Sequence, residues 1–182
     1  MRQTPGKAST PRTRLVELPG RGVTRVWECA GPPGAGTLVL IHGVTFTAEL
    51  NWGKAFAPLS RHFRVVAIDL RGHGDGISAD PRFRLEDCAD DIAALAGTLG
   101  IGRFTTVGYS LGGMVAQLLY RRHPSLLSCW RKARCLQRTK HRPGERRAGW
   151  WSADVSGGLC SVKVRPSTRS RLSMAMVRTK SG

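Results

Sequence analysis

The chain has 182 residues and a formal net charge of +17, from 29 basic and 12 acidic side chains. This length suits one hydrophobic core, and no stretch approaches the ~20 apolar residues of a membrane-spanning helix. Residues 1–128 hold 15 Lys and Arg against 10 Asp and Glu (net +5), and residues 129–182 hold 14 against 2 (net +12). Most of the basic excess therefore belongs to the last third of the chain, and nucleic-acid binding by the remainder is not expected.

The cysteine content argues against a disulfide framework or a zinc site. There are five cysteines, an odd number without paired metal-type spacing, and a reducing cytoplasm suits them. The N-terminus lacks the apolar core of a signal peptide, and residues 1–14 are basic and free of acids. We expect residues 1–14 to form a disordered basic tail, with a transit-like peptide as the less favoured interpretation.

The first half of the chain alternates strand and helix patterns. Residues 23–29 are rich in β-formers and end at a Gly-Pro-Pro-Gly turn, which predicts an early edge strand. Residues 37–41 and 64–70 are continuous apolar runs typical of strands buried on both faces. Between them, residues 50–61 carry apolar side chains at helical spacing. This order of strand, helix and strand predicts two parallel strands joined by a crossover helix.

The same alternation continues to Ser128. Residues 71–76 are Gly-rich and predict a loop at the carboxyl edge of the sheet, where open α/β sheets carry functional loops. Residues 85–99 read as an amphipathic helix, residues 104–109 as a strand and residues 111–123 as a helix. The predicted fold class is α/β, with a doubly wound, mostly parallel sheet.

A sharp turn is predicted where residues 104–109 pass into the following helix. Ser110 lies at this turn, with Gly108 and Gly112 two residues away on either side and Gly113 next in the helix. Small residues at these positions leave room for a strained backbone and for close packing of the helix on the strand. The arrangement is that of a nucleophile elbow, and the alternative is a serine that caps the helix.

Three segments together resemble the α/β-hydrolase superfamily, in particular its small esterase-like and C–C-hydrolase-like members, over about residues 16–128. They are LVLIHG, RVVAIDLRGHG and TTVGYSLGGMVAQLLYRRHP, in the order and at the spacing of that family. The resemblance implies hydrolysis of an ester or similar acyl bond in a small molecule, through an acyl-serine on Ser110 and without a cofactor. It also implies an oxyanion hole from the backbone N–H groups of Val44 and Leu111, supported by His42, Gly43 and the glycines of the elbow.

The acid and the histidine that the resemblance implies for a catalytic triad are missing from the sequence. The family places the triad acid and then the histidine after the serine. Between Ser110 and the last histidine, His141, the chain has no Asp or Glu, and no histidine follows Glu145 or Asp154. His42 precedes the serine and is expected to be structural. The sequence therefore predicts a partial α/β-hydrolase domain, residues 15–128, that is inactive as this chain.

The pattern changes after Ser128. Residues 129–182 contain seven Leu or Val and no Ile or Phe, too little to support a core at this net charge. Two interpretations stay open for this Arg-rich, non-periodic tail. The favoured one is a truncated gene or an altered reading frame. The other is a non-catalytic relic whose basic tail binds nucleic acid or an anionic membrane surface.

Overall fold

A computed structural model of the chain describes residues 7–79, 82–133, 153–154 and 161–162. The chain divides into two compact units, Met1–Lys132 and Ala133–Gly182. In the second unit the described residues form two short antiparallel strands, β7 (Ala153–Asp154) and β8 (Ser161–Val162). The other residues after 133, including most of the Arg-rich tail and His141, lie outside the described residues, as do residues 1–6 of the predicted N-terminal tail.

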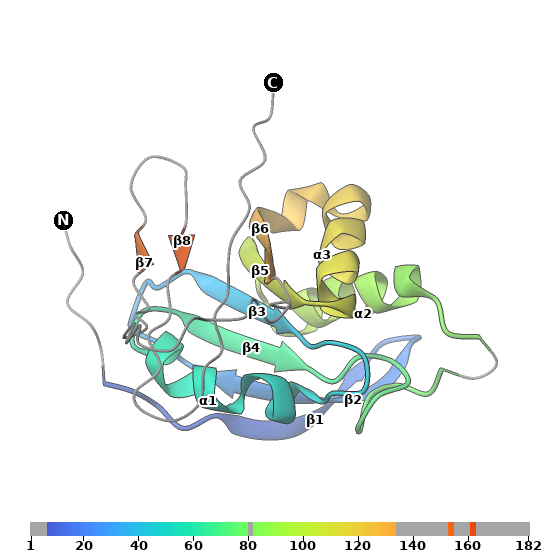
Figure 1. Cartoon of the computed structure of the whole chain (residues 1–182), viewed down its shortest axis with the longest axis horizontal. Coiled ribbons are helices and arrows are strands. Elements are labelled where there is room, and N and C mark those ends of the chain that lie inside the picture. Colours follow the sequence, from blue (N-terminus) through green and yellow to red (C-terminus); the bar gives the residue numbers. More distant parts are fainter. Residues whose placement is uncertain (1–6, 80–81, 134–152, 155–160, 163–182) are drawn as a thin grey trace, which may run out of the picture. The chain divides into compact units, whose positions relative to one another are not determined.

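The first unit is built on a mixed sheet of six strands in the order β1-β2-β4-β3-β5-β6 (Figure 1). The strands are β1 (Arg12–Leu18), β2 (Gly22–Cys29), β3 (Thr37–Ile41), β4 (Arg64–Ile68), β5 (Phe104–Tyr109) and β6 (Leu127–Ala133). Strand β3 pairs in parallel with β4 and β5, whereas the β1–β2 hairpin joins β4 in antiparallel orientation. The predicted α/β class and central parallel strands are confirmed.

Helices cover both faces of this sheet, because the side chains of each strand alternate between the two faces. Helices α2 (Leu85–Thr98) and α3 (Leu111–Arg122) pack together over Val39, Ile41, Val66 and Ile68. Helix α1 (Ala48–Ser60) packs on the other face, where it contacts β4 (Figure 1). Thr47 caps the start of this helix, because its hydroxyl accepts a hydrogen bond from the Leu50 N–H. None of the helices in the described part of the chain has the length and apolar character needed to cross a membrane.

The two outer strands differ from expectation. Strand β1 occupies the edge that residues 23–29 were predicted to form, and it begins inside the predicted tail, at Arg12. In this strand Val16 and Leu18 are buried and their neighbours are exposed, but the Arg-rich sequence makes this alternation hard to recognise. Strand β6 continues the sheet beyond the predicted boundary at residue 128. Strand β6 pairs with β5 at the edge of the sheet through backbone hydrogen bonds, which do not require a continuous apolar run of side chains.

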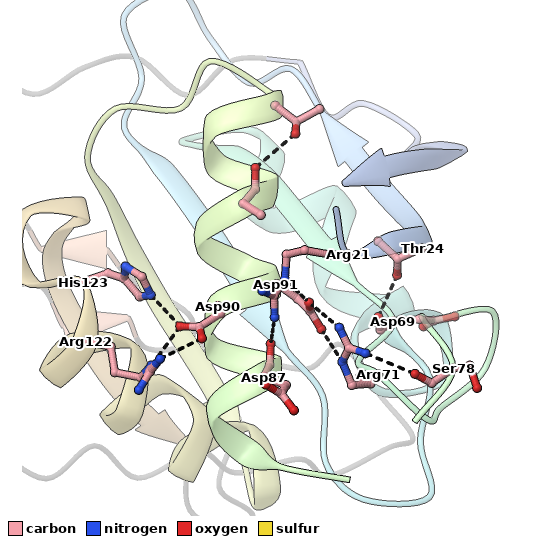
Figure 2. A network of polar contacts seen from close by, with 12 residues as sticks. Arg21, Thr24, Asp69, Arg71, Ser78, Asp87, Asp90, Asp91, Arg122 and His123 are labelled. Carbon is pink, nitrogen blue, oxygen red and sulfur yellow. Dashed lines mark hydrogen bonds and ion pairs between the residues drawn. The ribbon is translucent and has the colours of Figure 1, made fainter. Parts of the chain in front are cut away.

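A network of charged side chains joins the loops of this unit to helix α2 (Figure 2). The carboxylate of Asp91, on α2, is almost fully buried and accepts hydrogen bonds from two arginines. Arg71, from the Gly-rich loop, binds both carboxylate oxygens at 2.8 and 3.0 Å. Arg21, from the β1–β2 turn, approaches Asp91 Oδ1 to 2.5 Å and also donates to the Asp87 carbonyl at 3.0 Å. Asp91 therefore holds two loops, far apart in the sequence, against one helix.

A second ion pair joins α2 to the end of α3. Asp90 accepts two hydrogen bonds of 2.8 Å from the Arg122 guanidinium and one of 2.8 Å from the imidazole of His123 (Figure 2). The hydrogen bonds from Arg122 lower the pKa of Asp90 to about 2, against a smaller opposing effect of burial. This contact fixes the C-terminal end of α3, the end remote from Ser110.

Replacing Asp91 with Asn should reduce the free energy of unfolding by about 3 kcal/mol, because two half-buried guanidinium groups lose their common counter-charge. Chemical denaturation of the full chain measures this. Glu17→Gln, which removes one negative charge from an exposed position on β1, is the matched control and should change stability by less than about 0.5 kcal/mol. Equal effects of the two substitutions would show that the Asp91 network does not stabilise the fold.

Candidate functional site

The turn between β5 and α3 places Ser110 at the carboxyl edge of the sheet. Ser110 is exposed and has φ +50° and ψ −113°, an uncommon backbone conformation for a residue other than glycine. Its side chain makes no capping hydrogen bond to the helix, although it occupies the residue position before α3. The backbone carbonyl of Ser110 instead accepts a hydrogen bond of 2.9 Å from the Gly113 N–H. The serine hydroxyl is therefore presented at the tip of a tight turn.

The glycines of the motif permit this geometry. A Cβ atom at Gly108 would collide with the carbonyl oxygen of Gly112, and a Cβ atom at Gly112 would collide with the carbonyl oxygen of Ile41. The start of α3 thus rests directly on the backbones of β5 and β3. Both glycines are buried, and the nearby Gly113 is buried too. The spacing read from the sequence corresponds to this close contact between helix and sheet.

The loop that follows β3 lies beside the same turn. A Cβ atom on Gly43 would lie 2.8 Å from Cδ1 of Tyr109 and 3.4 Å from Cβ of Ser110. The structure therefore places Gly43, which lies between the predicted residues His42 and Val44, next to the predicted Ser110. The Phe46 and Tyr109 rings pack edge to face at 6.1 Å, which adds an apolar contact between loop and turn.

His42 is fully buried, and both of its ring nitrogens are engaged by backbone groups. Nε2 accepts a hydrogen bond of 2.9 Å from the Leu70 N–H, so the proton resides on Nδ1, which donates to the Gly43 carbonyl at 2.7 Å. Burial lowers the pKa of His42, assisted by the nearby His73, against opposing effects of the Gly43 carbonyl and Asp69. The imidazole is therefore held neutral as a bridge between two loops.

Asp69 follows β4 and ties the start of α1 to the Gly-rich loop. Its buried carboxylate accepts hydrogen bonds from the Ala48 N–H at 2.8 Å and the Asp75 N–H at 3.1 Å. Its backbone carbonyl accepts a hydrogen bond of 2.9 Å from the Thr24 hydroxyl (Figure 2). Asp75 also pairs with Arg25 at 2.7 Å. These acidic groups are engaged in positioning loops.

Sequence reasoning identified the turn and the loop but missed the groups that hold them. Asn51 accepts a hydrogen bond from Gly43, and Arg71 anchors the Gly-rich loop to Asp91. Although Arg71 lies in the RVVAIDLRGHG segment, the sequence indicates neither contact, since each joins residues of different elements. A cavity of about 240 Å³, lined by Arg25, Asp69 and Asp75 among others, does not include Ser110. Within the described ranges, no three His, Cys, Asp or Glu side chains are grouped to hold a metal ion.

Comparison with known proteins gives a consistent result. Residues 36–130 match the model of the family described as the alpha/beta hydrolase fold. The chain is 40% identical over 94 residues to a Pantoea ananatis protein provisionally named carbamate hydrolase RutD. This match covers 51% of this chain and 34% of that protein. It is 35% identical over 95 residues to the 2-(acetamidomethylene)succinate hydrolase of Mesorhizobium japonicum. This match covers 52% of this chain and 34% of that hydrolase.

Solved structures agree with the sequence relatives. Naproxen esterase of Bacillus subtilis superimposes with a TM-score of 0.60 at 25% identity, over 69% of this chain and 43% of the esterase. The chain spans about a third of the length of the curated relatives it matches. The matched region contains the loop after β3, the Gly-rich loop and the turn at Ser110. The chain belongs to the α/β-hydrolase fold family.

Proposed function

We propose that this chain carries the nucleophile and oxyanion-binding part of a serine hydrolase that cleaves an ester or similar acyl bond through an acyl-serine on Ser110. The observation that carries the proposal is the backbone of Ser110, which has positive φ at the junction of β5 and α3 and a hydroxyl without a capping role. A strained backbone persists where the surrounding packing imposes it, and such positions gather at active sites. A capping serine would show an extended backbone and a hydrogen bond to the helix.

The second part of the proposal concerns the oxyanion that forms when a serine attacks a carbonyl. The proposed donors are the N–H groups of Val44 and Leu111, and within the described residues neither donates to a protein acceptor. The Gly43 carbonyl and the Val44 N–H belong to one planar peptide and point in opposite directions. His42 Nδ1 and the Phe46 N–H hold that carbonyl, at 2.7 and 3.3 Å, which supports a fixed direction for the Val44 N–H.

The third part concerns the catalytic base, which in the order of the family follows the serine, whereas His42, His62 and His73 all precede Ser110. His42 has both ring nitrogens bound to backbone groups. His123 pairs with Asp90, but it follows the last residue of α3, a helix of 12 residues that begins after Ser110, which puts it about 20 Å from Ser110 along the axis. Together with the missing order of serine, acid and histidine after Ser110, this supports an inactive chain.

The substrate class follows from the relatives and from the chemistry of the turn. The relatives are named as hydrolases of a carbamate, an acetamido compound and an ester. We extend to this chain the common element of these names, a small molecule with an acyl bond open to nucleophilic attack. Attack by a serine at a pre-formed oxyanion site needs no cofactor. The hydrolase fold hosts several chemistries, so the residues around Ser110 carry the proposal.

Treatment of the full chain with a fluorophosphonate probe should label Ser110 slowly or not at all, and turnover of p-nitrophenyl acetate should remain near background, because no base activates the hydroxyl. Intact-protein mass spectrometry and absorbance at neutral pH measure the two rates. The Ser110→Ala variant is the control for each. Brisk turnover that Ser110→Ala abolishes would contradict the proposed inactivity while supporting the nucleophile.

The buried His42 should make the chain sensitive to mild acid. The pKa of His42 in the folded state lies below its ordinary value of 6.5, so the unfolded chain binds the proton more readily. The stability that neutral His42 contributes is present above about pH 6.5 and is lost as the pH falls toward the folded pKa. The depressed pKa of Asp90 acts in a separate, lower window, from near pH 4 down to about 2.

Urea denaturation at pH 7.5 and 5.5 measures this effect. His42→Gln should remove most of the difference in stability between the two pH values, whereas His62→Gln, at an exposed position, should leave it unchanged. A parent chain equally stable at both pH values would show that His42 is not held neutral by the fold.

A further inference from the structure

The loop between β3 and α1 holds a strained residue beside the proposed nucleophile. Thr45 has φ +63°, a left-handed conformation that is unfavourable for a β-branched side chain. Val44 and Thr45 are exposed, and the Phe46 ring packs edge to face on Tyr109 at the turn. Together with this ring contact, hydrogen bonds at the base of the loop hold the strained backbone.

Gly43 is the residue through which the loop is held. Its carbonyl accepts hydrogen bonds from His42 Nδ1 and the Phe46 N–H, both within the loop or at its start. Its buried N–H donates a hydrogen bond of 3.0 Å to Oδ1 of Asn51. This last contact connects the loop with the body of helix α1, because Asn51 lies one turn inside the helix.

We propose that Asn51 is a positioning residue: it holds the N–H of Gly43, in the His42–Gly43 peptide, and by fixing Gly43 it helps to direct the following Val44 N–H toward the oxyanion formed at Ser110. The inference rests on the proposed function, since it assigns to Asn51 a part in the same site. Asn51 does not contact the reacting atoms. It acts through Gly43, which lies next to Ser110: a Cβ atom on Gly43 would be 3.4 Å from Cβ of Ser110.

The chemistry of the side chain suits this role. The Gly43 N–H is buried and needs an acceptor, which the carboxamide oxygen of Asn51 supplies. A leucine at position 51 has a similar size but no acceptor, so it would leave the N–H without a partner and release the loop. An aspartate keeps an acceptor oxygen on the same short side chain. The pair of substitutions therefore separates the hydrogen bond from the space that the side chain fills.

Amide NMR of the ¹⁵N-labelled full chain tests the proposal in the parent, Asn51→Leu, Asn51→Asp and Leu50→Ala. In Asn51→Leu the exchange of the Gly43 N–H with solvent should accelerate about tenfold, the equivalent of one lost hydrogen bond, and the Gly43 and Val44 resonances should move. Asn51→Asp should restore both resonances toward the parent. Leu50→Ala, at an exposed neighbouring position of α1, should leave them in place.

Two outcomes would overturn the proposal: Gly43 and Val44 resonances that are unchanged in Asn51→Leu, or resonances that move equally in Asn51→Leu and Asn51→Asp. Failure of the proposed function has a different signature: at alkaline pH and long exposure, where hydroxide can take the place of the missing base, a fluorophosphonate should label the parent and not Ser110→Ala, and equal labelling of the two would contradict the nucleophile. In that case Ser110 is not the nucleophile, and the amide resonances still decide whether Asn51 holds the loop.

Discussion

Direct contact between the start of α3 and the backbones of β3 and β5 is the constraint on which the rest of the site depends. Side chains at Gly108 or Gly112 would push the helix away from the sheet, since each Cβ atom would occupy the place of a backbone carbonyl. With both absent, the chain reverses between β5 and α3 within one residue, and Ser110 takes up the resulting positive φ. Because β3 lies between β4 and β5, the loop that follows β3 reaches the same point.

The surrounding contacts stabilise what this packing creates. Ser110 and Thr45 both have unfavourable backbone conformations, and each costs on the order of 1–3 kcal/mol that neighbouring interactions must offset. His42 joins the loop after β3 to Leu70, Asp69 joins the start of α1 to the Gly-rich loop, and Asp91 joins that loop to α2. Each link runs between elements distant in the sequence, so the strain at the site depends on the whole unit being folded.

The parts of this arrangement that could be predicted from the sequence are those with local signals. Continuous apolar runs identified β3 and β4, and the spacing of Gly108, Ser110 and Gly112 identified the turn. The missed parts depend on contacts between distant residues: no local pattern indicates that Asn51 binds Gly43 or that Asp91 binds two arginines. Strands β1 and β6 were not predicted, because sheet pairing depends on backbone hydrogen bonds. Their side chains show no clear strand pattern, since charged residues interrupt the apolar ones.

The most direct test of the central constraint is the unfolding free energy of Gly112→Ala compared with Gly97→Ala. Gly97 lies on the exposed face of α2, and an added Cβ atom there would meet nothing within 4 Å. Because alanine favours helices, Gly97→Ala should leave stability unchanged or raise it by up to about 1 kcal/mol. Gly112→Ala should lower it by about 3 kcal/mol, because the helix must move away from β3. Equal tolerance of the two substitutions would contradict the close contact between α3 and the sheet.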